Sequence, residues 1–287
     1  MEKAVDSSDA KPVKPLDLPR KIFNIGKLGE ALKEKLKRRL VAVQRDFAGD
    51  YIYFEGVFDD GVTAGSDGAP DALAREGLFD FFRERELLPF IRLDLSRAPH
   101  DADGRLKTDE SLLMLKTFME ALVTSQPQEY WEGSLFEIAH SKAIDNTCFM
   151  ECYARIYSLL KSFSPRTGVG LYSFDRSNRG NYDALEERLI LCGKGRCDPD
   201  FVTIDVNPAI DFEMGTRTGR SDEIEKVWHV INDSGAAAME MYVIERKDPR
   251  GSARLESDVS GRIASMVLSL PEYGDKISGA VFWLNGE

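Results

Sequence analysis

The chain lacks a long apolar run. None of its 287 residues belongs to an uninterrupted hydrophobic stretch of the roughly 18 residues that a membrane span requires. The N-terminal text, MEKAVDSSDAKPVKPLDLP, also lacks the apolar centre of a secretory signal peptide. We therefore expect a soluble cytoplasmic protein without membrane insertion.

Positive charge is in deficit. The chain carries 38 Lys and Arg against 49 Asp and Glu, so its formal net charge is −11. Because phosphate binding requires a basic surface, this balance argues against a nucleic-acid partner and against docking on anionic lipid. The composition fits a protein with a neutral ligand.

Cysteine is scarce, with four in the chain, at positions 148, 152, 192 and 197. One interpretation pairs Cys148 and Cys152 with Cys192 and Cys197 as the two halves of a metal site. The pairs of zinc sites are usually closer in sequence and lie on turns, so small buried core residues in a reducing compartment are the favoured interpretation.

Short strand-like runs alternate with helical patterns through most of the chain. Residues 1–20 are rich in Pro, Lys and Ser and are expected to form a flexible N-terminal segment; residues 21–287 would form one domain. Helical spacing of apolar residues predicts seven helices, within 28–47, 78–87, 112–123, 149–163, 184–193, 224–231 and 263–270. The predicted strands are 22–25 (weak), 51–58, 89–96, 135–139, 169–174, 201–208, 239–246 and 277–285.

This alternation predicts an α/β fold, a (β/α)₈ TIM barrel. Several strands are almost continuously apolar, as parallel strands covered on both faces should be. A doubly wound open sheet is the alternative, but it calls for a glycine-rich loop after the first strand, and IGKLGE lacks that pattern. The sequence ends just after the predicted eighth strand, so the barrel is expected to lack its closing C-terminal helix.

Acidic and aromatic residues gather at the carboxyl ends of the predicted strands, where barrel enzymes place their active sites. Carboxylates accept hydrogen bonds from sugar hydroxyls and aromatic rings stack on sugar faces, so these ends suit a polyol ligand. The strand-end residues are Glu55, Asp59, Asp94, His140, Ser141, Asp175, Asp205, Asn207, Glu245, Trp283 and Asn285.

Glu245 is the strongest single catalytic candidate. It ends the apolar run MYVIE and is followed by Arg246, so a rigid strand would fix its carboxylate. Glycoside cleavage needs two carboxyl groups about 5 Å apart for retention and further apart for inversion. The alternative role for Glu245 is a salt-bridged residue of the barrel rim.

The ordered set of motifs resembles the catalytic barrel of family 39 glycoside hydrolases, the β-xylosidase and α-L-iduronidase group, over most of residues 22–285. The similar segments are IGKLGEALKEKLKRRLVAVQRDFAGDYIYFEGVFDD, LLPFIRLDLS, YWEGSLFEIAH, FMECYARIYSLLKSFSPRTGVG, DPDFVTIDVNP, EMYVIERK and YGDKISGAVFWL. The resemblance implies a (β/α)₈ barrel and a retaining glycosidase site.

The resemblance places the family's nucleophile at Glu245, but other site positions differ. The family's Trp-Asn-Glu-Pro is Ala139-His140-Ser141-Lys142 here, so Ser141 takes the place of the acid/base glutamate. Serine is too weak an acid to protonate a leaving group, and general acid catalysis contributes roughly 10²–10⁴-fold. The family's histidine after strand two is Glu55, its His-x-Tyr is Asp205-x-Asn207, and the tryptophan after its nucleophile is Arg246.

Three hypotheses follow. In the first, a degenerate glycosidase barrel binds a saccharide or serves as a scaffold in polysaccharide synthesis or sensing; Glu55, Asp94, His140, Asp205, Asn207, Arg246 and Trp283 would contact the ligand. In the second, an active retaining β-glycosidase uses Glu245 as nucleophile, with Glu55, His140, Asp205 or Glu137 as a relocated acid/base. In the third, the barrel is a protein-interaction module whose flank binds a partner.

No cofactor or metal is expected. A Mg²⁺ or Ca²⁺ variant built on Glu55, Asp94, Asp205 and Glu245 is the weaker alternative, because oxygen ligands suit these ions.

Overall fold

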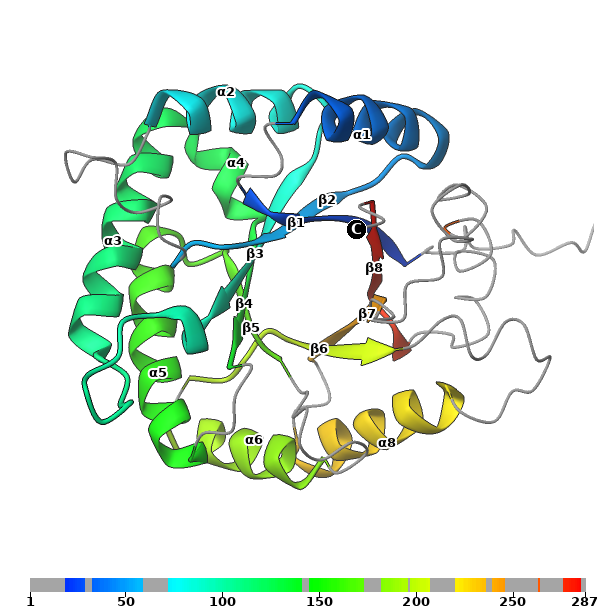
Figure 1. Ribbon diagram of the computed structural model, residues 1–287. Coiled ribbons are helices and arrows are strands. Elements are labelled where there is room, and N and C mark those ends of the chain that lie inside the picture. Colours follow the sequence, from blue (N-terminus) through cyan, green and yellow to red (C-terminus); the bar gives the residue numbers. More distant parts are fainter. Residues whose placement is uncertain are drawn as a thin grey trace, which may run out of the picture.

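A computed structural model describes residues 19–28, 33–58, 72–140, 145–172, 182–195, 197–206, 220–235, 239–245, 263 and 276–284. Eight parallel strands close into a barrel in sequence order, which confirms the predicted (β/α)₈ fold. Figure 1 shows helices α1, α2, α3, α5, α6 and α8 around the outside of the strands.

The strands are β1 (Arg20–Lys27), β2 (Tyr51–Glu55), β3 (Leu88–Asp94), β4 (Leu135–Ala139), β5 (Gly168–Tyr172), β6 (Phe201–Val206), β7 (Glu240–Glu245) and β8 (Gly279–Trp283). The helices are α1 (Glu34–Phe47), α2 (Ala72–Arg83), α3 (Thr108–Ser125), α4 (Gln128–Glu132), α5 (Asn146–Phe163), α6 (Asp183–Gly195) and α8 (Arg220–Asp233), with a 3₁₀ turn η2 (Leu95–Arg97).

Alternate residues of each strand face two different cores. In β7, Met241 and Val243 belong to the core between strands and helices, whereas Tyr242 and Ile244 belong to the core inside the barrel. This period of two is the ordinary consequence of strand geometry. It allows each strand-end residue to be assigned an inward or an outward register position.

The lower barrel is filled by three aromatic rings, Phe90, Phe201 and Tyr242. Their centroids lie 5.3 to 5.6 Å apart and each pair meets edge to face, a favourable geometry for aromatic rings. Glycines on neighbouring strands leave the room: a Cβ atom at Gly170 would lie 2.3 Å from the Phe201 ring, and one at Gly279 would lie 2.8 Å from the Tyr242 ring. The barrel is therefore packed below its mouth and has no axial pore there.

Several element boundaries differ from the sequence prediction. The weak first run is a full eight-residue strand, β1, because it pairs with both β2 and β8. Helix α1 begins only at Glu34, since Lys33 is extended. Helix α2 begins and ends earlier than predicted, with its last residue at Arg83. Glu86 has a φ of 57°, a left-handed conformation that is incompatible with a continuing α-helix. The short helix α4 was not predicted.

Two predictions fall mostly outside the described residues. Of the expected flexible segment, the structure describes only Pro19 and Arg20, the latter already in β1. Of the expected helix at 263–270, it describes only Ile263, which is fully buried.

The cysteines divide into two groups. Cys152, Cys192 and Cys197 are buried, as a core role predicts, but Cys148 is exposed because it lies on the solvent side of α5. Among the described residues, no three His, Cys, Asp or Glu side chains are grouped so that they could hold a metal ion. No helix in the described ranges is both long and apolar enough to cross a membrane.

Candidate functional site at the barrel mouth

Four of the predicted site residues occupy inward register positions at the carboxyl ends of the strands. Glu55 follows Tyr53 on β2, Asp205 follows Thr203 on β6, and Asp94 and Trp283 end β3 and β8. The closed barrel brings these strand ends to one rim, as the sequence predicted. We call this set, together with the inward residues directly below it, the mouth.

Asp94 has a structural task at the mouth. Its Oδ1 accepts hydrogen bonds from the backbone N of Ser96 (3.0 Å) and from the Ser96 hydroxyl (2.8 Å), and Arg97 lies 3.9 Å from its Oδ2. The side chain is 7 % exposed and caps the turn η2. Its carboxylate oxygens are thus largely engaged by its own loop.

Asp205 is held by a tyrosine from the neighbouring strand. The Tyr172 hydroxyl donates a hydrogen bond to Asp205 Oδ2 at 2.7 Å. Burial, together with the negative charge of Asp205, raises the pKa of Tyr172, so this phenol keeps its proton at neutral pH. The Arg92 guanidinium lies over the Tyr172 ring, 4.1 Å from its centroid, a cation–π contact.

Below the rim, Arg92 and Glu137 lie side by side on β3 and β4 in direct register. Arg92 Nη1 is 3.5 Å from Glu137 Oε1, and Arg92 Nε is 3.9 Å from Glu55 Oε2. The Tyr53 hydroxyl donates to Glu137 Oε2 at 2.8 Å and accepts from Arg92 Nη1 at 3.3 Å. One cation therefore lies between an interior carboxyl group and a carboxylate of the rim.

Glu137 is fully buried, and its protonation is unusual. Burial, with the charge of Asp205 as a smaller cause, raises the pKa of Glu137 to about 7, although Arg92 and Tyr53 act in the opposite direction. Its Oε1 and the Nε of Arg92 are buried polar atoms without a hydrogen-bond partner among the described residues. We therefore expect Glu137 to bind and release its proton closer to neutral pH than a solvated glutamate does.

Glu245 and Trp283 bind each other reciprocally. Glu245 Oε2 accepts a hydrogen bond from the backbone N of Trp283 (3.0 Å), and Trp283 Nε1 donates to the backbone O of Glu245 (2.6 Å). Glu245 is 3 % exposed and continues the outward register of Met241 and Val243. Its carboxylate therefore joins the end of β7 to the end of β8.

The segment after β4 is described only in part. His140 directly follows the strand at an outward register position and is partly buried. Asp145, the first carboxylate after the strand, accepts from the backbone N of Cys148 at 3.1 Å and caps α5. Of the predicted site, Ser141, Asn207 and Arg246 lie outside the described residues, as do the strand-end residues Asp59, Asp175 and Asn285.

The sequence interpretation missed Arg92, Tyr53 and Tyr172 as parts of the mouth. A signal existed for Arg92, because a charged residue in the middle of an apolar strand needs a buried partner. Glu137 in the middle of the next strand, LFEIA, is that partner. The sequence contains no comparable signal for the tyrosines, since aromatic residues in strands are usually core.

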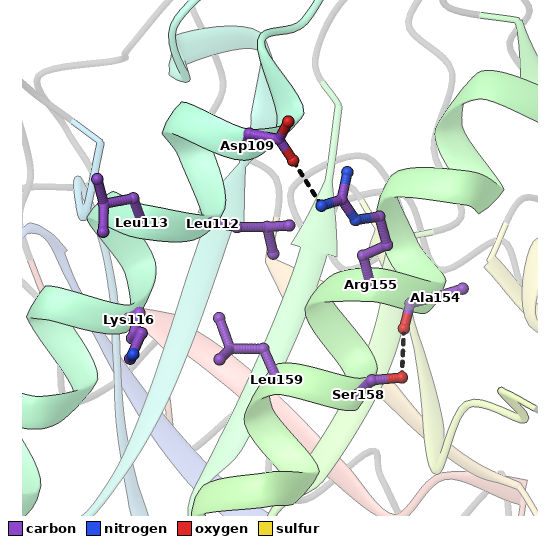
Figure 2. A pocket seen from close by; sticks show the side chains of 8 residues that line it. All are labelled: Asp109, Leu112, Leu113, Lys116, Ala154, Arg155, Ser158 and Leu159. Atoms are coloured by element: carbon purple, nitrogen blue, oxygen red, sulfur yellow. Dashed lines mark hydrogen bonds and ion pairs between the residues drawn. The ribbon is translucent and has the colours of Figure 1, made fainter.

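A separate groove of about 620 Å³ lies outside the barrel, between α3 and α5. Figure 2 shows Leu112 on α3 and Leu159 on α5 between the two helices, with the Asp109–Arg155 ion pair at one end; Leu113 and Lys116 of α3 also line the groove. Its lining is mainly aliphatic and contains none of the predicted site residues. We therefore keep the mouth as the candidate site.

Neither a comparison with models of protein families nor one with curated proteins finds a match to this chain. Comparison with solved structures does. A GH39 enzyme from Xanthomonas axonopodis pv. citri superposes with a TM-score of 0.71 at 16 % identity, over 94 % of this chain and 59 % of that one. A GH39 β-xylosidase from Caulobacter crescentus gives 0.69 at 17 % identity, over 96 % and 63 %.

A third similar structure is the cellulose synthase subunit Z from Clostridioides difficile, with a TM-score of 0.55 at 12 % identity, over 92 % of this chain and 91 % of that one. This chain spans only about three fifths of the length of the two GH39 structures. At these identities the likeness concerns the fold alone: the chain has a (β/α)₈ barrel similar to the barrels of these glycoside-hydrolase structures.

Proposed function

We propose that the mouth binds a saccharide without hydrolysing it, so that the chain serves as a binding or scaffold domain in carbohydrate metabolism. The ligand would contact Glu55, Asp205 and the Trp283 ring, with His140, Asn207 and Arg246 as further candidates. The fold that the chain shares with the cellulose synthase subunit Z supports a setting in polysaccharide synthesis.

The observation that carries this proposal is the Glu245–Trp283 pair. A nucleophilic carboxylate needs an oxygen directed at the sugar, whereas Glu245 takes an outward register position and bonds a backbone N–H of β8. The second carboxyl group needed for hydrolysis is also absent from its family position, which is Ser141. Both considerations favour binding over cleavage.

Aryl β-glycosides with activated leaving groups test the proposal directly. These substrates need little protonation, so a surviving nucleophile would still release the aryl group. We expect no release above background from the wild-type chain or from Glu245→Ala. The measurement is single-turnover absorbance over a panel of gluco-, xylo- and galactosides.

Glu240→Ala is the matched control, because Glu240 lies on the same strand at its opposite end, beside Arg20. Release by wild type and Glu240→Ala but not by Glu245→Ala would overturn the proposal. It would establish instead the alternative, a retaining glycosidase with Glu245 as nucleophile and a relocated acid/base.

Saccharide binding itself can be measured on a glycan array followed by calorimetry. We expect Asp205→Asn to weaken the affinity for any captured glycan about tenfold, because a charged acceptor contributes roughly 1.5–3 kcal/mol. Asp200→Asn, at the base of the same strand, should leave affinity unchanged. Capture of no glycan by a folded chain would favour the third hypothesis, a protein-interaction module.

A further inference from the structure

The interior of the mouth contains an ion pair, Arg92 and Glu137, whose charged groups are close but form no direct hydrogen bond. Arg92 and Glu137 are 3.5 Å apart without a hydrogen bond between them, although both are almost completely enclosed. A buried charged pair is ordinarily stabilised by short, well-aligned hydrogen bonds. A pair left at this distance keeps part of the hydrogen-bonding capacity of both groups unused.

Arg92 has a second acidic neighbour on the side of the rim. Its Nε is 3.9 Å from Glu55 Oε2, again too far for a hydrogen bond, and the Arg92 side chain is 13 % exposed against 27 % for Glu55. The guanidinium is therefore shared between an enclosed carboxyl group and a more open one. One face of the guanidinium lies over the Tyr172 ring, 4.1 Å from the ring centroid.

We propose that Glu137 and Arg92 form a proton-sensitive contact: ionised Glu137 holds the Arg92 guanidinium toward the barrel interior, and protonated Glu137 leaves it to Glu55 at the mouth. A carboxylic acid attracts a guanidinium far less than a carboxylate does, and Glu55, 3.9 Å from Arg92 Nε, is the acidic group on the other side of the guanidinium. The electrostatic character of the mouth would then change when a single buried proton binds or leaves.

The groups that act on Glu137 come from four other strands of the barrel and oppose one another. Tyr53 donates a hydrogen bond and Arg92 supplies positive charge, and both favour the ionised form. The loss of water on burial has the largest effect and favours the protonated form, and the negative charge of Asp205 adds to it. The titratable and charged side chains around Glu137 are Tyr53 and Glu55 on β2, Arg92 on β3, Tyr172 on β5 and Asp205 on β6.

The contact can be tested without a saccharide, so its failure is distinguishable from failure of the proposed function. With ¹³C-labelled glutamate carboxyls and ¹⁵N-labelled arginine, NMR follows Glu137 and the Arg92 Nε–H group between pH 5 and 9. We expect both signals to titrate with one midpoint near pH 7. In Glu137→Gln the carboxyl signal is lost, and Arg92 should no longer titrate.

Two further variants should move the shared midpoint in opposite directions. Tyr53→Phe removes a donor to the carboxylate and should raise it, whereas Asp205→Asn removes a negative charge and should lower it. These variants also serve if Glu137→Gln does not fold. An Arg92 signal that stays constant through the Glu137 titration, or that titrates unchanged in Glu137→Gln, would overturn the proposal.

Discussion

Adding one methyl group at Gly170 is expected to lower the free energy of unfolding by about 3 kcal/mol. The Cβ atom of Gly170→Ala would lie 2.3 Å from two atoms of the Phe201 ring. That ring cannot turn away freely, because it packs edge to face against Phe90 and Tyr242 at centroid distances of 5.3 Å. Chemical denaturation followed by circular dichroism measures the loss.

Gly77→Ala and Gly193→Ala provide the matched comparison. Both glycines are exposed on helices, α2 and α6, and a Cβ atom at either position would meet nothing within 4 Å. Alanine there should stabilise the chain by about 0.5–1 kcal/mol, because it raises helix propensity and restricts the unfolded state. If Gly170→Ala were as harmless as these two, the aromatic packing inside the barrel would be looser than the contacts imply.

Gly170 also shows which features of the fold could be predicted from the sequence and which could not. The alternation of β and α segments was readable because each strand is buried on both faces and each helix on one, as in β4, LFEIA, where all five residues are buried. The filling of the barrel was not readable. Gly170 and Phe201 are 31 positions apart, and only the register between β5 and β6 brings them together.

The candidate site likewise had features that the sequence could predict and features that it could not. The closed barrel brings all strand ends to one rim, so the predicted fold alone was enough to place Glu55, Asp205 and Trp283 at that rim. It could not predict that Asp94 would cap its own turn or that Glu245 would bond the backbone of β8, because both depend on local hydrogen bonds. The resemblance to family 39 enzymes drew attention to Glu245 and Ser141, and Glu137 entered only as one of four candidates for a relocated acid/base.

Replacing Glu137 by glutamine is expected to remove a pH dependence of stability worth about 3 kcal/mol. Burial raises the pKa of this carboxyl from 4.5 to about 7 in the folded chain, and a difference of that size corresponds to about 3 kcal/mol. Below pH 4.5 the carboxyl group is protonated in both the folded and the unfolded chain, so it does not lower the free energy of unfolding. Between pH 4.5 and 7 only the unfolded chain releases the proton freely, so stability falls as pH rises; above 7 the loss is constant.

Glutamine has nearly the same shape as glutamate and no charge, so the stability of Glu137→Gln lacks this fall. The stability difference between Glu137→Gln and wild type should therefore shift in favour of the variant as the pH rises from 4.5 to 7.5. Urea unfolding at several pH values measures this difference directly, and other titrating groups cancel because both chains share them. Glu120→Gln, on the exposed face of α3, should follow the wild-type curve. A constant difference between Glu137→Gln and wild type across this range would mean that Arg92 and Tyr53 fully compensate the burial of the carboxylate. Glu137 would then be an ordinary ionised partner of Arg92, without a role as a group that binds a proton near neutral pH.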